Sequence, residues 1–418
     1  MDSWSYRRRS CRLCDSTALQ CVVPLQPIPI VTPNVDATSA LQQFAGVEGR
    51  SVPLDLHLCG ACGHLQLLDV INPDVQYNNF TYTTSISRGL PEHFRRFVDE
   101  VISTVGAAPG AFVVEVGSND GTILRAFKER GLKVLGVDPA QKIAARATEN
   151  GVKTLATFFT EELAGEMRAD YGAADIVVAN NTFANIDDLG DFAAAVRKLL
   201  APSGVFVFET SYGADVVRKT LIDTIYHEHL SYFMVAPLDR YFARHGMQLI
   251  DVEHIWTKGG SIRGIVQLAG GPRPRKASVD AMMAQEKDQG LGGVAPYQKL
   301  KADVAALQAE LAGLLAKRRA AGKRVAGYGA SVGTVTLIHQ FRLGAALEFI
   351  ADDNPLCEQL SGADYRIPVV RSEKIYERKP DSIILLAWRY ADPIIARHER
   401  YLREGGEFIT PLPRVAIR

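Results

Sequence analysis

The sequence lacks long hydrophobic runs and has no excess of charge of either sign. No stretch approaches twenty uncharged apolar residues, so we expect no membrane-spanning helix. The start of the chain, Met-Asp-Ser-Trp-Ser-Tyr-Arg-Arg-Arg, lacks the apolar segment of a signal peptide, and we predict a cytoplasmic protein. The 47 basic and 47 acidic side chains balance, which predicts no general attraction to nucleic acid or to an anionic membrane.

Cysteine is also scarce, yet four of the six cysteines form two Cys-x-x-Cys motifs. Two such motifs offer four thiolates to one tetrahedral ion, which predicts structural Zn²⁺ at Cys11, Cys14, Cys59 and Cys62. The alternatives are disulfides, which a reducing compartment disfavours, or a redox dithiol, which needs only one pair. His57 and His64 are further candidate ligands. Four thiolates leave no open coordination position, so we expect the ion to stabilise the fold.

Length and hydrophobic patterning predict an α/β protein of three domains. A chain of 418 residues with 47% hydrophobic side chains can bury two or three cores. Residues 1–72 are expected to form a small β-rich zinc domain. Strands and helices alternate through residues 73–275, which predicts a doubly wound, Rossmann-like parallel sheet. Residues 276–296 have the composition of a connecting element, and a second Rossmann-like pattern follows, so the third domain is expected at 276–418.

A strand that ends in a glycine turn predicts an adenosine-type cofactor site. Residues 112–116 are apolar except for Glu115, Gly117 and Gly121 bracket a polar turn, and Asp138 closes the next strand. Glycine lets the backbone approach a ligand, and an acid at the second strand tip accepts hydrogen bonds from a ribose. The turn lacks the Gly-x-Gly-x-x-Gly spacing that a pyrophosphate needs, and suits a zwitterionic amino-acid tail. The alternative is an ordinary strand–turn–helix connection.

A polar cluster at residues 223–233 is the candidate catalytic segment. Tyr226, His227, Glu228 and His229 place a phenol, two imidazoles and a carboxylate within four residues. In a helical turn, Tyr226 and His229 share a face, and histidine titrates near neutral pH, as a general base requires. A two-histidine metal site or a plain interface helix would give the same pattern. The strand tips at 180–181 and 209–212 are expected to face the same crevice.

Together with the cysteine motifs, five segments resemble one enzyme family. They are Tyr82-Thr-Thr-Ser, Glu115-Val-Gly-Ser-Asn-Asp-Gly-Thr, Tyr226-His-Glu-His-Leu-Ser-Tyr-Phe, Lys258-Gly-Gly-Ser-Ile-Arg and Gly327-Tyr-Gly-Ala. The chain is similar, over nearly its whole length, to the three-domain sugar C-methyltransferases of antibiotic deoxysugar pathways, notably those that methylate C-3′ of dTDP-3-amino-4-keto sugars. The resemblance implies a zinc-binding N-terminal domain, a central class I methyltransferase domain that binds S-adenosylmethionine, and a C-terminal domain that helps to bind the dTDP-sugar.

The resemblance also implies roles for individual residues. His229 would remove the proton at sugar C-3, Tyr226 and Glu228 would orient the base or the enolate, and methyl transfer would invert C-3. We expect cofactor contacts from Tyr82, Ser85, Glu115, Gly117, Ser118, Asn119, Asp120, Gly121, Asp138, Asn180 and Asn181. We expect substrate contacts from Lys258, Ser261, Arg263, Tyr328, Ser331, Asn354 and Trp388. The last four would otherwise be packing residues. A monomer that binds a dTDP-linked ketosugar is expected.

The chain departs from the family pattern at two catalytic positions. Phe80 stands where family members commonly carry Tyr, and Asn185 stands where they carry His. Both departures remove a group that can transfer a proton, so the resemblance predicts an active-site variant of reduced activity, with Tyr82 as the remaining phenol. Two other functions fit part of the sequence: S-adenosylmethionine-dependent methylation of oxygen or nitrogen in a small metabolite, or non-catalytic binding of a nucleotide-sugar.

Overall fold

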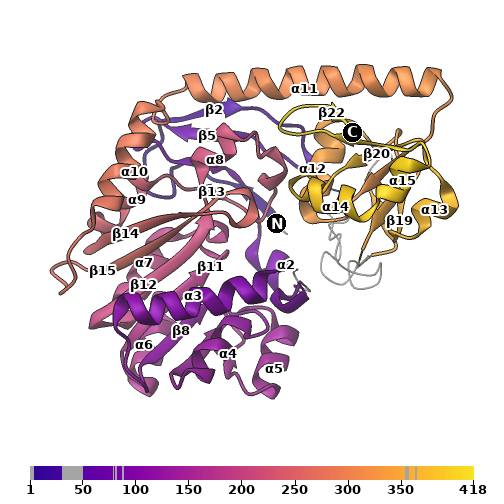
Figure 1. Ribbon diagram of the computed structural model, residues 1–418. Coiled ribbons are helices and arrows are strands. Elements are labelled where there is room, and N and C mark those ends of the chain that lie inside the picture. The colour runs from indigo at the N-terminus through magenta and orange to yellow at the C-terminus, as the bar shows by residue number, and fades with distance from the viewer. Residues whose placement is uncertain are drawn as a thin grey trace.

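The structure, a computed structural model, describes residues 4–30, 50–78, 80, 82–86, 89–353, 357–362 and 365–418. Three larger sheets, here called N-terminal, central and C-terminal, form the body of the molecule. The long helix α11 (Ala295–Ala320) runs from the side of the N-terminal and central sheets to the C-terminal sheet (Figure 1). Within these ranges, no helix is both long and apolar enough to cross a membrane. The mixed α/β fold class predicted from the sequence is confirmed.

The N-terminal sheet has four antiparallel strands, and the fourth comes from far along the chain. β2 (Leu19–Val23), β5 (Leu56–Cys59) and β6 (Leu65–Leu67) are followed at the edge by β13 (Ser231–Tyr232). Short ladders join β1 (Ser5–Arg7) to β7 (Asp69–Ile71), and β3 (Ile28–Pro29) to β4 (Ser51–Val52). Helix α2 (Pro73–Tyr77) follows. The cysteine-bearing sheet therefore holds the segment that directly follows Tyr226–His229.

The central sheet has the order β10-β9-β8-β11-β12-β15-β14. Its first five strands are parallel, namely β10 (Thr154–Leu155), β9 (Lys133–Val137), β8 (Phe112–Val116), β11 (Ala174–Asn180) and β12 (Leu200–Ser211). An antiparallel hairpin completes the sheet with β15 (Ser261–Leu268) and β14 (Met247–Ile255). The chain order reverses between β8 and β11, which is where ligands bind in such sheets.

Helices cover both faces of the central sheet, because successive strand residues point to opposite sides. Val113 packs toward α3 (Leu90–Val105) and α4 (Thr122–Glu129), whereas Val114 packs toward α6 (Glu161–Tyr171) and α7 (Leu189–Leu199). Helix α3 has Pro91 in its first turn and is followed by Gly106 with φ 68°, residues that favour the start and the end of a helix. The other helices of this part are α5 (Gln141–Glu149), α8 (Gly213–Arg218) and α9 (Val235–Arg244).

Residues 276–296 are not a simple connection, which corrects the sequence prediction. They contain helix α10 (Ala277–Asp288), which packs on β14. The flanking prolines and the Gly-Leu-Gly-Gly stretch mark the ends of this helix rather than a loop. Glu286 of α10 accepts hydrogen bonds from the backbone N–H groups of Val235 (2.6 Å) and Ala236 (2.9 Å), and so satisfies the N-terminus of α9.

The C-terminal sheet is also mostly parallel. Its order is β18 (Gln359–Ser361), β19 (Arg366–Arg371), β17 (Ile350–Asp352), β16 (Val325–Tyr328), β20 (Ser382–Leu385), β21 (Glu407–Thr410) and β22 (Ala416–Ile417). The helices of this part are α12 (Val332–Gln340), α13 (Lys374–Arg378), α14 (Ala391–Arg397) and α15 (Glu399–Arg403). Helix α12 follows a glycine turn and contacts the segment before Tyr226, where Thr336 Oγ1 donates to the carbonyl of Ile225 (2.9 Å).

Candidate active site

One cavity joins the glycine turn after β8 to the polar cluster at 226–229. Of the predicted residues, those that line it are Phe80, Tyr82, Glu115, Gly117, Ser118, Asn119, Asp138, Asn180, Asn181, Asn185, Tyr226, Glu228, His229 and Lys258. Tyr77, which was not among the residues predicted from the sequence, also lines the cavity. The site therefore combines segments that lie far apart in the chain, at the edge of the central sheet where β8 and β11 end.

The glycine turn has the backbone conformation that its sequence predicts. Gly117 has φ 71°, and a Cβ placed there would lie 2.2 Å from Thr182 Oγ1, so only glycine fits. Asp138 accepts hydrogen bonds from the N–H groups of Asn119 (2.8 Å) and Ala140 (2.9 Å). Each carboxylate oxygen retains a second lone pair for a ligand hydroxyl, so Asp138 can hold the turn and bind a ribose at the same time.

The segment 82–85 is fixed over this turn by side chains of the turn itself. Asn119 donates to the carbonyl of Tyr82 (2.9 Å) and accepts from the N–H of Thr84 (2.8 Å). Asp120 accepts from the N–H of Ser85 (3.0 Å). Asp120, Ser85 and Gly121 lie outside the cavity lining, and the hydrogen bond between Asp120 and Ser85 holds the loop against the turn.

Four polar atoms of the lining are buried and have no hydrogen-bond partner among the described residues. They are Glu115 Oε2, Ser118 Oγ, Asn180 Nδ2 and Asn185 Oδ1. An unpaired buried polar atom costs about 1–3 kcal/mol, so such a cluster indicates groups that a ligand completes. Burial, together with the nearby Asp120 and Asp138, raises the pKa of Glu115 well above its usual value. Acceptors and donors of this kind fit the ammonium, carboxylate and adenosine groups of S-adenosylmethionine.

Tyr226 and His229 face each other, although the element that carries them is a turn and not a helix. The N–H of His229 donates to the carbonyl of Tyr226 (3.0 Å), which closes a tight turn, and the two ring centroids lie 4.1 Å apart. His229 Nδ1 lies 2.9 Å from the carbonyl of Thr224, which can only accept, so the ring proton is on Nδ1. Nε2 is then free of hydrogen and accepts from the Tyr226 hydroxyl (2.9 Å).

The charges around His229 favour a neutral imidazole. Burial, followed by the positive charge of Lys258, lowers the pKa of His229 to about 3. Burial raises the pKa of Glu228 to about 7 and lowers that of Lys258 to about 8, while each of these two groups partly offsets the shift of the other. The cavity thus holds a proton-free imidazole nitrogen. It also holds a carboxyl group and an amine whose pKa values are both shifted toward neutral pH.

Lys258 stands at the start of three consecutive residues with left-handed backbone. Its φ is 53°, followed by 91° for Gly259 and 149° for Gly260. Lys219 Nζ bridges the carbonyl of Gly259 (2.8 Å) and the buried carboxylate of Asp215 (3.1 Å). A Cβ on Gly260 would lie 1.7 Å from Asp215 Oδ2. The loop that presents Lys258 is therefore shaped around the buried carboxylate of Asp215 and its ion pair with Lys219.

Gly260→Ala is expected to destabilise the protein by about 3 kcal/mol or more, because overpacking against Asp215 adds to the strain of a positive φ. Gly172→Ala is the matched control: Gly172 also has a positive φ (90°), but no atom lies within 4 Å of its Cβ position. Urea unfolding of both variants tests this, and equal losses would show that the Asp215 contact is harmless.

The aromatic and amide groups near the departures from the family pattern form one cluster. The ring of Phe80 lies edge-on to Tyr77 (5.8 Å) and to Tyr82 (6.3 Å). Asn185, in the 3-10 turn η2 (Phe183–Asn185), hydrogen-bonds to Tyr77. Besides Tyr82, a second phenol therefore lies beside Phe80, and no spacing in the sequence identifies it.

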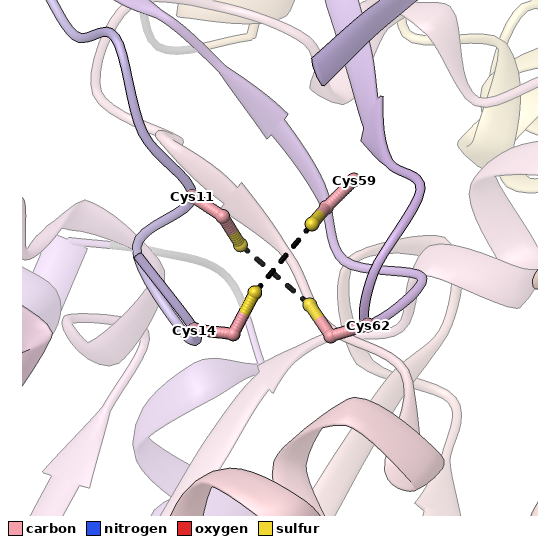
Figure 2. A group of neighbouring side chains, drawn as sticks. All are labelled: Cys11, Cys14, Cys59 and Cys62. Atoms are coloured by element: carbon pink, nitrogen blue, oxygen red, sulfur yellow. Dashed lines mark hydrogen bonds between the residues drawn. The ribbon is translucent and has the colours of Figure 1, made fainter. Parts of the chain in front are cut away.

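The four cysteines of the two motifs converge on one point (Figure 2). Their Sγ atoms all lie within 4.8 Å of one another, with Cys11–Cys62 and Cys14–Cys59 at 3.6 Å. A tetrahedron of Zn–S bonds of 2.3 Å has edges of about 3.8 Å, so the four thiolates fit zinc. His57 and His64 bind elsewhere, to the Asp55 carbonyl and to the Ser231 hydroxyl, and do not belong to this cluster.

Several residues predicted to bind the substrate lie outside the cavity lining. Ser261, the first residue of β15, donates to the carbonyl of Thr257 (3.0 Å) in the preceding 3-10 turn. Arg263 binds the carboxylate of Glu209 (2.7 Å), whose other oxygen contacts His93 (2.8 Å). Residues 209–212, which were expected to face the crevice, are also outside the lining.

The predicted contacts of the C-terminal sheet have partners within the protein. Tyr328 donates to Asp353 (2.5 Å), Ser331 caps α12, and Trp388 Nε1 donates to Asp223 (3.1 Å). These three residues are outside the lining of the cavity. Asn354 lies outside the described residues.

Comparison with known proteins identifies the family. Family models match residues 11–77 as a zinc binding domain, 90–252 as a methyltransferase domain and 256–413 as the C-methyltransferase C-terminal domain. The chain is 34% identical over 366 residues to the C-methyltransferase NovU from Streptomyces niveus. The aligned region covers 87% of each protein. The chain belongs to the C-methyltransferase family. The protein is therefore an S-adenosylmethionine-dependent C-methyltransferase with a structural zinc site, as predicted from its sequence.

Two further matches each cover less than half of this C-methyltransferase. The ubiquinone biosynthesis O-methyltransferase of Burkholderia pseudomallei is 24% identical over 160 residues, which is 35% of this chain and 68% of that protein. The solved structure of the CcbJ methyltransferase from Streptomyces caelestis is 16% identical, covers 42% of this chain and 89% of its own, and has a TM-score of 0.34.

Proposed function

We propose that this C-methyltransferase transfers a methyl group to C-3′ of a dTDP-linked 3-amino-4-keto-deoxysugar. The observation that carries the proposal is the single cavity that joins Glu115 and Asp138, on the cofactor side, to Tyr226, His229 and Lys258. A cofactor and a ketosugar bound at its two ends would meet in one cavity, which supplies the proximity that methyl transfer requires.

The proposed reaction begins with proton removal by His229. A hydrogen on the carbon beside the 4-keto group is acidic because the resulting carbanion delocalises into an enolate. His229 Nε2, which carries no hydrogen, would take the C-3 proton, and Nδ1 would remain bonded to the Thr224 carbonyl. Bound S-adenosylmethionine supplies an electrophilic methyl group. C-3 would accept this methyl group on the face opposite to proton removal, with inversion, and S-adenosylhomocysteine would be the leaving group.

Three neighbours would support this base. The Tyr226 hydroxyl, 2.9 Å from Nε2, would orient the ring and then pass to the substrate. Ionised Glu228 would favour the imidazolium that His229 becomes, and the ammonium of Lys258 would stabilise the enolate oxygen. Phe80 and Asn185 supply no proton-transfer group, so we expect turnover below that of family members with Tyr and His at these positions.

We further propose the division of the chain into residues 1–72, 73–275 and 276–418, a monomeric state, and a role of the C-terminal part in holding the dTDP moiety. The contact of Trp388 with Asp223, three residues before Tyr226, supports a link between that part and the active site.

The decisive experiment combines binding and turnover. Titration calorimetry is expected to show binding of both S-adenosylmethionine and dTDP. Incubation with the ketosugar is expected to give a product that is methylated at carbon and heavier by about 14 mass units, the mass of one CH₂. Binding of the cofactor without dTDP would favour methylation of a small metabolite, and binding of dTDP without the cofactor would leave a nucleotide-sugar binding module.

The dependence of kcat/KM on pH is expected to be bell-shaped. Activity should rise as Glu228 ionises near pH 7, because its charge favours proton uptake by His229, and fall as Lys258 loses its proton near pH 8. His229 itself, with its pKa near 3, stays neutral across this range. Rate profiles of Glu228→Gln and Lys258→Met should lack the acid limb and the alkaline limb, respectively. An unchanged profile in both variants would remove these two roles.

A further inference from the structure

Arg12 lies between two zinc-binding cysteines, yet its side chain reaches the residue that follows His229 and the segment that follows Asn185. The side chain is fully buried. Nε donates to Asp187 Oδ1 (2.9 Å), and Nη1 lies 3.2 Å from Gln66 Oε1 and 3.4 Å from the carbonyl of Leu230. Nη1 also donates to the carbonyl of Leu67. One guanidinium therefore contacts three separate segments of the chain.

Two of these segments carry residues of the proposed mechanism. Leu230 directly follows His229, and Asp187 stands two residues after Asn185. Leu230 is itself fixed on both sides: its carbonyl accepts from the N–H of Leu67 (2.9 Å), and its N–H donates to the carbonyl of Ala184 (2.9 Å). Arg12 thus lies where the cysteine-bearing sheet, the turn at 226–229 and the turn at 183–185 meet.

The chemistry of these contacts requires an arginine. A guanidinium has five donors in a rigid plane, so it can bind a carboxylate and carbonyl oxygens at the same time, whereas an ammonium is a compact point charge. A neutral side chain at position 12 would leave Asp187 without this partner and would free the carbonyls of Leu67 and Leu230 from their common donor. The turn that carries His229 would then lose the guanidinium that joins Leu230, the next residue, to Leu67 and to Asp187.

We propose that Arg12 is a positioning residue that couples the geometry of the four-cysteine site to the placement of His229. This inference rests on the proposed function, since it assigns His229 its part in proton removal. A displacement of about 1 Å at a reacting group can lower a rate by about 100-fold, so a loosened turn affects turnover much more than binding.

Arg8 provides a matched control on the same carboxylate. Its Nη1 donates to Asp187 Oδ2 (3.1 Å) and to the Asp187 carbonyl (3.1 Å), and its described hydrogen bonds do not include Leu67 or Leu230. Its side chain is 20% exposed. Arg8→Met removes one arginine from Asp187 and leaves the turn at 226–229 in contact with Arg12. Comparison of the two positions therefore separates loss of an ion pair from loss of the bridge.

The test uses the full-length zinc-loaded protein and the variants Arg12→Met, Arg12→Lys and Arg8→Met. In both Arg12 variants we expect kcat to fall about 100-fold, with one zinc per chain and with the KM for S-adenosylmethionine and the affinity for S-adenosylhomocysteine within twofold of wild type. Arg8→Met should keep kcat within threefold. Hydrogen–deuterium exchange of peptides that cover residues 226–233 should accelerate about tenfold in the Arg12 variants and remain unchanged in Arg8→Met.

Contrary outcomes are distinct. Wild-type kcat in Arg12→Lys, or equal losses at Arg8 and Arg12, would overturn the positioning role. Loss of zinc or of S-adenosylhomocysteine binding in both Arg12 variants would overturn it too, because Arg12 would then be needed for the fold itself. If the wild-type protein does not act on the dTDP-ketosugar, the proposed function fails, and amide exchange still decides whether Arg12 holds the turn.

Discussion

His229→Ala is expected to abolish exchange of the sugar C-3 hydrogen with solvent deuterium when S-adenosylhomocysteine is bound. A general base contributes about 10²–10⁴-fold, so exchange should fall by at least that range. The prediction depends on Nε2 of His229, which carries no hydrogen and faces the cavity beside Tyr226. Loss of the C-3 signal in proton NMR spectra recorded in D₂O measures it without the methyl-transfer step.

His227→Ala is the control for this experiment. His227 lies in the same turn and is also buried, but its Nε2 contacts the carbonyl of Val52 (3.3 Å) and it does not line the cavity. Exchange in this variant should stay within a few-fold of wild type, as should the affinity for S-adenosylhomocysteine in both variants. Undiminished exchange in His229→Ala would move the base elsewhere. Glu228, with its pKa near 7, would be the first group to examine.

The central sheet was predictable from sequence because its strands are parallel and buried on both faces. Such strands read as short apolar runs between amphipathic helices, and β9 and α3 show these two patterns. Helix α10 was missed because its flanking prolines and glycines outweighed its helix-forming interior. The sequence predicts that Tyr226 and His229 share a face of a helical turn. The two residues do face each other, but in a tight turn outside any helix, which also brings residues i and i+3 together.

The candidate site was only partly predictable, because its supports are contacts between distant residues. Local motifs identified the cysteines, the glycine turn and the residues 226–229. No pattern in one sequence indicates that β13 joins the N-terminal sheet, that Arg12 reaches Leu230, or that Tyr77 lies beside Phe80. These pairings depend on how the domains pack, and packing leaves no periodic signal in the chain.

Cys59→Ser is expected to remove zinc and to unfold the N-terminal sheet. Zinc binding by small structural sites contributes about 10–16 kcal/mol, which equals or exceeds the usual total stability of a domain, about 5–15 kcal/mol. Cys59 is buried at the end of β5, between β2 and β6, so the loss of its thiolate affects the centre of that sheet. Metal analysis should fall from one zinc per chain toward zero, and thermal unfolding should show the loss of a folded unit.

Cys21→Ser is the matched control, because Cys21 is exposed on β2 and outside the four-cysteine cluster, and it should keep both zinc and stability. Because β13 is the outer strand of the N-terminal sheet, Cys59→Ser should also release the turn at 226–229. Binding of S-adenosylhomocysteine, which depends on the central sheet, should then survive better than exchange at sugar C-3. A metal-free Cys59→Ser protein with normal folding and normal exchange would show instead that the four thiolates are not needed to hold the active site.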